Sequence, residues 1–271
     1  MRRFSILAFF MAFVSSFAFG WGQKGHDIVA EIAGRHLTPA ARHAVDSILG
    51  GRSMVYWANW LDNASHTPEY AYSKTWHYKN VDEGDTYESA LANPAGDAVT
   101  AIKAQIETLS DHSAPIEKSG LAMKMLIHIV GDLHQPMHMG HASDLGANRI
   151  KVKYFGRDVN LHSVWDGSIL AGGHAWSYSE WADQLDRVTP EEEALIADGS
   201  VDDWARETLP IAAEIYRSFP QGTNISYNEV FEWTPVVEQQ LLRGGLRLAR
   251  ILNALFDPSL AGTGPYRPQD H

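Results

Sequence analysis

The chain has 271 residues, 45% of them hydrophobic, and a formal net charge of −11 at pH 7. This balance argues against a protein that grips nucleic acid with a broad basic face, although metal cations could hold a polyanionic substrate locally. The chain has no cysteine, which excludes disulfide bonds and thiolate ligands. Any metal site must therefore use His, Asp, Glu and backbone groups, which favours zinc or manganese in an open, catalytic type of site.

Residues 1–20 have the features of a signal peptide. Two arginines precede a short apolar run over residues 6–14, and Ala18 and Gly20 are small residues at −3 and −1 of a cleavage site before Trp21. The run is too short for a membrane-spanning helix, which needs roughly 20 apolar residues. We therefore predict cleavage before Trp21 and a soluble mature chain that is periplasmic or secreted.

Helices dominate the predicted elements after the signal peptide. Apolar residues at helical spacing predict helices over residues 25–37, 54–64, 94–109, 119–133, 162–170, 179–188, 201–219 and 234–256. A further helix is predicted to begin at Thr38-Pro39 and to end at Gly50-Gly51. Residues 149–155 alternate as a strand and predict a hairpin that turns at Gly156-Arg157. The prediction is an all-α fold, a single multi-helix domain with a small β-hairpin over residues 21–260, followed by a flexible tail over 261–271.

Two pairs of histidine and aspartate have the spacing of one helical turn. His128 and Asp132 lie in the most apolar predicted helix, and His162 and Asp166 repeat the spacing in a short one. Residues four apart project from the same helix face, so each pair could bind one ion. Such pairs are also common on solvated helix surfaces. Both pairs here lie among apolar and aromatic residues, however, where a carboxylate or imidazole without a partner is costly.

Three more residues could join these pairs. His138 follows the break that Pro136 makes after the same helix, so it can point back toward His128. Asp62 and His77 are embedded in aromatic segments. His134, by contrast, falls on another helix face and is expected to be a structural group.

Five separated motifs then occur in order along the chain. They are WGxxGH from Trp21, WxxWLD ending at Asp62, WHY around His77, HIVGDLHQPMH from His128 to His138, and NLHSVWD ending at Asp166. This set resembles the zinc-dependent, single-strand-specific nucleases, the nuclease S-one and nuclease P-one family. The resemblance covers residues 21–166, and the absence of cysteine, unlike the fungal members, favours a bacterial source.

The resemblance implies three zinc ions and a set of ligands. A first zinc would take Asp62, His77, His128 and Asp132; a second, beside it, Trp21 through its amine and carbonyl, His26 and a bridging Asp132; and a third, set apart, His138, His162 and Asp166. In this family a water shared by the first and second zinc ions is the nucleophile. The resemblance therefore implies that Asp62 and Asp132, which would hold these two ions, are catalytic residues. The third ion stabilises the leaving oxygen. The amine of Trp21 can bind zinc only after the signal peptide has been removed. Export of the protein and activation of its metal site would therefore be linked.

The implied activity is endonucleolytic hydrolysis of single-stranded DNA and RNA to 5′-phosphorylated products, with 3′-nucleotidase activity, by a protein that we expect to be monomeric. Three substrate-binding residues are implied. Tyr78 matches an aromatic residue that stacks on a base, although a core aromatic is as plausible. Asn148 matches an asparagine near the scissile group. Asn80 replaces an aspartate that reads the base edge in fungal members, so the base preference stays open.

Two other functions remain open. Zinc-dependent phospholipase C resembles this family in fold and zinc ligands, but its last zinc motif ends in glutamate, where this chain has Asp166. A non-catalytic zinc-binding protein would predict closed coordination, without a shared ligand such as Asp132.

Overall fold

A computed structural model of the chain describes residues 21–90 and 92–266. The predicted signal peptide, with its cleavage motif, and the end of the predicted tail lie outside these residues, so both stay predictions. In the part of the chain that is described, no helix combines the length and the apolar character needed to cross a membrane.

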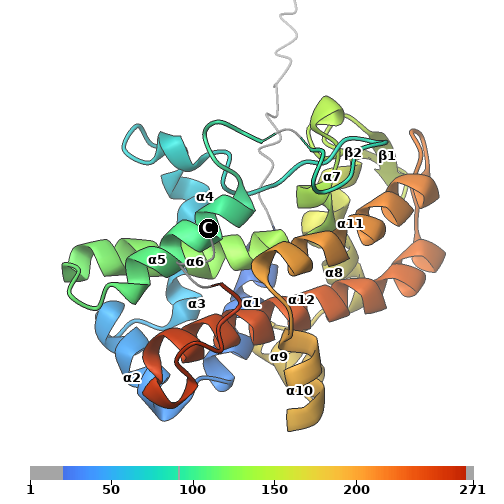
Figure 1. Cartoon of the computed structure of the whole chain (residues 1–271). Coiled ribbons are helices and arrows are strands. Elements are labelled where there is room, and N and C mark those ends of the chain that lie inside the picture. Colours follow the sequence, from blue (N-terminus) through green and yellow to red (C-terminus); the bar gives the residue numbers. More distant parts are fainter. Residues whose placement is uncertain (1–20, 91, 267–271) are drawn as a thin grey trace, which may run out of the picture.

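The described chain is mainly helical, as the sequence predicts (Figure 1). The α-helices are α1 (Gln23–Arg35), α2 (Pro39–Ile48), α3 (Met54–Trp57), α4 (Trp60–Ala64), α5 (Ala98–Ser110), α6 (Ile116–Leu133), α7 (Leu161–Ser163), α8 (Ile169–Gly173), α9 (Tyr178–Leu185), α10 (Pro190–Ala197), α11 (Val201–Ser218) and α12 (Tyr227–Phe256). Short 3-10 or π turns are η1 (Ala71–Ser73), η2 (Pro136–Met139), η3 (Ala142–Asp144), η4 (Val164–Ser168) and η5 (Pro258–Leu260). The strands are β1 (Lys151–Tyr154), β2 (Arg157–Asn160) and β3 (Asn224–Ile225).

Helix α6 is the centre of the fold. Every residue from 125 to 133 is buried, and α5, α1, α2, α3, α4 and α12 all contact the helix. Figure 1 shows α6 crossing the middle of the molecule, with α5 beside it and the long α12 below. Its polar residues His128 and Asp132 therefore have no face of the helix on which they could reach solvent, and their partners must be inside the protein.

Capping explains where several helices begin. The Thr38 hydroxyl accepts from the amide of Ala41, which starts α2 at the predicted place. The predicted start of α12 at residue 234 is wrong, because a capping box between Ser226 and Glu229 starts the helix at Tyr227, and the helix continues through a proline. Likewise α5 starts at Ala98 rather than at residue 94, behind a capping box.

The predicted hairpin is present, with one more strand than expected. Strands β1 and β2 are antiparallel, with Lys151 opposite Asn160, and the chain turns at Phe155 and Gly156, whose φ angles are 50° and 78°. Strand β3 pairs with β1 in parallel, giving the order β2-β1-β3. The Asn160 side chain then caps α7, so the hairpin leads directly into His162.

Histidine 36, at the end of α1, makes the stability of the fold depend on pH. Its ring nitrogens lie 2.6 Å from Oδ1 of Asp186 and 3.0 Å from Oε2 of Glu193. Burial alone lowers the pKa of His36, but these two carboxylates outweigh it and raise the pKa above its ordinary value of 6.5. The resulting stabilisation is fully present below that value and is lost as the pH rises through the folded-state pKa.

We therefore expect His36→Gln to lower the free energy of unfolding by about 1 kcal/mol at a pH near 5.5 and by much less near 9. Urea unfolding of both proteins at the two pH values measures this. A loss of the same size at both would contradict the ion-pair account.

Candidate metal centre

Three groups of His and Asp side chains meet inside the fold. Within each group, among the described residues, the possible ligand atoms lie within 4.8 Å of one another. The groups are His26, Asp62 and His128; His77, His128 and Asp132; and His138, His162 and Asp166. Every histidine and aspartate that the sequence predicts as a zinc ligand is in one of them, although these residues come from distant parts of the chain.

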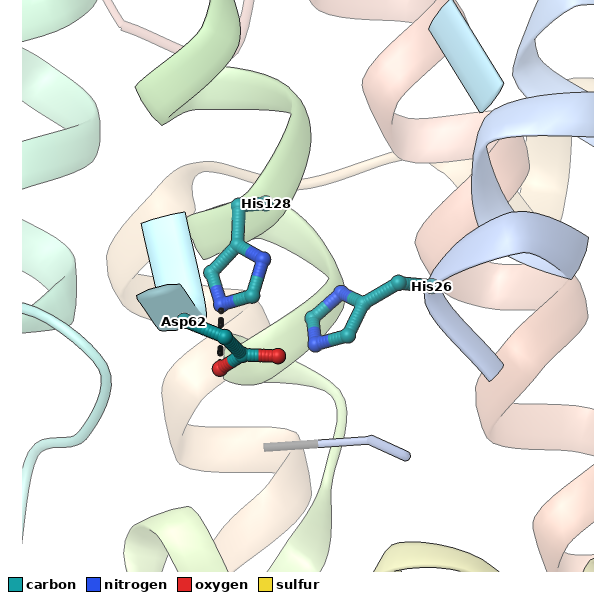
Figure 2. A group of neighbouring side chains, drawn as sticks. All are labelled: His26, Asp62 and His128. Atoms are coloured by element: carbon teal, nitrogen blue, oxygen red, sulfur yellow. Dashed lines mark ion pairs between the residues drawn. The ribbon is translucent and has the colours of Figure 1, made fainter. Parts of the chain in front are cut away.

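Helix α6 orients the first of these side chains. The Nδ1 atom of His128 lies 2.7 Å from the carbonyl oxygen of Ala58, which leaves its Nε2 atom facing inward. This Nε2 lies 3.4 Å from Oδ1 of Asp62 and 3.1 Å from Oδ2 of Asp132. Figure 2 shows His128, Asp62 and His26 converging from three separate helices, with the first two joined by the ion pair. A backbone carbonyl that fixes the outer ring nitrogen is the usual support of a metal-bound histidine.

Asp132 lies where the first two groups meet and faces the third. Its Oδ2 atom is 2.9 Å from Nδ1 of His77, and its Oδ1 atom is 3.4 Å from Nε2 of His26 and 3.5 Å from Nδ1 of His138. The side chain is completely buried. A carboxylate with histidines at both oxygens has the geometry of a bridging ligand.

The third group is built around the end of the hairpin. The Nδ1 atom of His138 lies 2.5 Å from the carbonyl oxygen of His77, and that of His162 lies 2.5 Å from the carbonyl oxygen of Gly146. One turn later, in the π turn η4, Asp166 places Oδ1 3.4 Å from Nε2 of His162. The Gln135 side chain donates to the same oxygen at 2.7 Å.

Several buried polar atoms in these groups have no hydrogen-bond partner among the described residues. They are both ring nitrogens of His26, Nε2 of His77, Nε2 of His162 and Oδ1 of Asp132. A buried donor or acceptor left unpaired costs about 1–3 kcal/mol, so several together in one place call for a further partner. Metal ions fit this donor set of imidazole nitrogens and carboxylate oxygens.

The protonation of the groups also favours cations. Burial lowers the pKa of His138 to about 3 and lowers those of His26 and His162, so all three rings are neutral, the form that binds metal. Burial raises the pKa of Asp166 well above its ordinary value, and the carboxylates of Asp132 and Asp62 add to this rise. The Asp166 carboxyl therefore needs either a proton or a cation beside it.

His128 differs from the other histidines. Burial works against its protonation, but the carboxylates of Asp132 and Asp62 outweigh it and hold the pKa of His128 well above the ordinary value. The same interaction keeps the pKa of Asp132 well below its ordinary value, despite burial. Without metal, a proton on His128 therefore takes the place that a cation would fill.

Two glycines allow the N-terminal segment to approach the centre. The amide of Gly22 donates to the backbone oxygen of Asp166 at 2.6 Å, and a Cβ atom at position 22 would lie 3.0 Å from that oxygen. On α6, a Cβ atom at Gly131 would lie 2.9 Å from Nδ1 of His26. Trp21 itself is completely buried. The WGxxGH motif thus contacts the metal groups at two places, with Gly22 against Asp166 and His26 against Gly131 of α6.

A cavity of about 350 Å³ opens beside the groups. It is lined by Asp62, Ser65, His66, Lys74, His77, Tyr78, Asn80, Met137, His138, Leu145, Gly146, Asn148 and His162. The three predicted substrate-binding residues therefore face the same cavity as four of the metal-group residues. A larger cavity of about 700 Å³, next to Asp144 and Tyr216, contains none of the three groups.

Sequence reasoning missed some of these lining residues. No spacing or motif in the sequence singles out His66 or Lys74, and Lys74 is the only Lys or Arg among the residues that line the cavity. Both lie in loops, where no helical period signals direction; their closeness to Asp62 and His77 in the chain is the only signal. His134 is a structural group, as predicted: its Nε2 atom faces Arg247 at 3.1 Å, away from the metal groups.

Comparison with known proteins decides the family. The family model described as S1/P1 Nuclease matches residues 21–257. The chain belongs to the S1/P1 nuclease family. The predicted resemblance is thereby confirmed, and the chain is a nuclease, a hydrolase that acts on phosphodiester bonds.

The relatives in this family align with this chain over most of their length. The chain is 28% identical to Endonuclease 2 of Arabidopsis thaliana, over 88% of this chain and 91% of the relative. It is 28% identical to Nuclease P1 of Penicillium citrinum, over 89% and 100%, and 25% identical to Nuclease S1 of Aspergillus oryzae, over 89% and 94%. Because the matched residues begin at Trp21, the S1/P1 nuclease similarity includes the segment that lies against Asp166.

Proposed function

We propose that this chain is a three-zinc endonuclease that hydrolyses single-stranded DNA and RNA to 5′-phosphorylated products and also removes 3′-phosphates from nucleotides. The observation that carries the proposal is Asp132, whose two oxygens face histidines of all three groups beside the open cavity. A shared carboxylate whose neighbouring groups line an open cavity, here through Asp62, His77, His138 and His162, favours a catalytic centre over a closed structural site. The absence of cysteine favours oxygen and imidazole ligands throughout.

In this proposal each side chain has a distinct task. Asp62, His77 and His128 would hold one ion together with Asp132. His26, with the freed amine and carbonyl of Trp21 and with Asp132, would hold a second. His138, His162 and Asp166 would hold the third. Bound zinc would acidify a shared water toward neutral pH and screen the charge of the phosphate. Asp62 and Asp132 would orient these first two ions, and the backbone carbonyls behind His128, His138 and His162 keep these rings in place.

The cavity wall supports a role in substrate binding. Tyr78 is half-buried and follows His77, so its ring could stack on a base next to the scissile phosphate, which contributes about 1–3 kcal/mol with little regard to base identity. Asn80 and Asn148 would hydrogen-bond to the base or the leaving group. Lys74 is exposed at the same wall and would pair with a phosphate oxygen. We further propose that the enzyme works as a monomer in the periplasm or outside the cell, after cleavage before Trp21.

The proposal is tested on four substrates: single-stranded DNA, RNA, a 3′-nucleotide and phosphatidylcholine. We expect hydrolysis of the first three, loss of at least about a hundred-fold in rate on treatment with a chelator, and recovery on addition of zinc. The heat-denatured protein is the control for contaminating activity. Chelator-sensitive hydrolysis confined to the lipid would overturn the proposal.

A further inference from the structure

The exposed side of the hairpin has an unusual run of positive charge. Arg149, Lys151 and Lys153 are exposed, while Ile150 packs against the core and Val152 is buried between them. Alternate residues of a strand point to opposite faces, so Lys151 and Lys153, which both lie in β1, share one face, and Arg149 lies in the turn just before the strand. We call these three residues the basic strip.

No carboxylate among the described residues makes an ion pair with the basic strip. Arg149 donates to the carbonyl oxygen of Ser143 at 2.9 Å, and Nζ of Lys151 lies 3.5 Å from the carbonyl oxygen of Asn148. Five of the ten other arginines among the described residues do pair with acids, namely Arg35, Arg206, Arg217, Arg247 and Arg250. The basic strip is distinct because its three cations without acids follow one another along one segment of an acidic chain.

The residues opposite the strip do not cancel its charge. Asp158 lies opposite Lys153 in the register of β1 and β2, without an ion pair between the two side chains, and is the one acid among these neighbours. Asn160, opposite Lys151, and Asn224, beside Lys153 in β3, are neutral. The face therefore keeps a local excess of positive charge.

The basic strip begins at the cavity of the metal centre. Asn148 lines that cavity and directly precedes Arg149. The loop that contains Asn148 is tied to the centre by the contact of 2.5 Å between Nδ1 of His162 and the carbonyl oxygen of Gly146. Figure 1 shows the hairpin next to α7, the helix that carries His162. The strip thus directly follows a residue of the cavity wall and continues along β1.

We propose that the basic strip binds backbone phosphates of a single-stranded polynucleotide beyond the phosphate that is cleaved. This inference rests on the proposed function, since it requires a polynucleotide in the cavity. Lys151 and Lys153 lie about 7 Å apart along the strand, so their ammonium groups can meet successive phosphates of an extended chain. Such contacts are independent of sequence and weaken with salt. They let an acidic enzyme hold a long strand that its net charge would repel.

The test compares a single strand of about 12 nucleotides with a dinucleotide, which has only one phosphate between its nucleosides. For the triple variant Arg149→Gln, Lys151→Gln, Lys153→Gln we expect KM for the long strand to rise about tenfold at low salt, with kcat unchanged. The slope of log KM against log salt should fall by about 2, roughly 0.7 for each lost phosphate contact. Both constants for the dinucleotide should stay within about twofold.

Two further proteins separate the strip from general effects of charge. The variant Arg52→Gln, Lys118→Gln, Arg187→Gln removes the same charge from exposed positions outside the cavity and should leave all constants unchanged. The variant Lys151→Arg, Lys153→Arg keeps the charge and should retain the low KM. Equal effects on both substrates, or an equal effect of the distant triple variant, would overturn the inference.

The two proposals fail in different ways. If the unmodified protein cleaved neither nucleic-acid substrate, the proposed function would fall. Fluorescence anisotropy of the labelled long strand would then test the inference about the basic strip by itself. Weaker binding by the strip variant than by the distant triple variant would support the inference, and equal binding would overturn it.

Discussion

Replacing Asp132 by asparagine is expected to reduce nuclease activity on the order of a thousand-fold, which corresponds to about 4 kcal/mol of transition-state stabilisation. The reason is the position of the carboxylate between His26, His77 and His128, with His138 beyond them. A neutral amide has only one acceptor oxygen and cannot bridge two cations. The variant should also lose metal, measured by elemental analysis after dialysis, from the first two groups but not from the third.

Asp97→Asn is the matched control. Asp97 is also a buried aspartate, but it caps α5 and lies outside the three groups, and asparagine caps helices equally well. This variant should keep full metal content and activity. If Asp132→Asn retained the metal content of the parent, the bridging role would be wrong.

A single residue added before Trp21 is the second change with a large expected effect. It converts the free amine into a peptide nitrogen, which has no lone pair for a metal. We expect the extended protein to bind one ion fewer than the processed protein and to lose about a hundred-fold in activity. The two forms are compared by metal analysis and by rate on the same single strand.

Because Trp21 is completely buried, an added residue could also act by displacing its side chain. Trp21→Phe with a free N-terminus separates these effects, since it alters the ring and keeps the amine. It should retain the full number of ions. Full occupancy and activity in the extended protein would show that the amine is not a ligand.

The parts of the fold that follow local rules could be predicted from the sequence. Helices α1, α2, α6 and α11 have clear periodicity or caps, and their observed bounds lie close to the predicted ones. Strand β3 could not be predicted, because its two residues pair in parallel with β1 from far along the chain. Helix α12 starts at Tyr227, before the predicted residue 234, because the capping box at Ser226 determines its start and the helix continues through Pro235.

The candidate site likewise contains residues that local spacing predicts and residues that only tertiary packing brings together. The spacing of His128 with Asp132 and of His162 with Asp166 is visible in the sequence because a helical turn brings each pair together. That Asp132 would lie against His26 depends on the packing of α1 on α6 at Gly131, which no local pattern encodes. Lys74 and His66 reach the cavity from loops, so only the folded chain reveals them.

If the three groups hold metal as proposed, the complete burial of α6 around His128 and Asp132 links the metal content of this enzyme to its resistance to unfolding. Metal-free protein must keep carboxylates in its interior with only a shared proton to balance them, so binding free energy becomes folding free energy. The melting temperature should therefore rise with free zinc concentration. A cell compartment poor in zinc would then hold not only an inactive nuclease but also one that opens more readily to proteases, so that zinc supply would set the amount of enzyme as well as its activity.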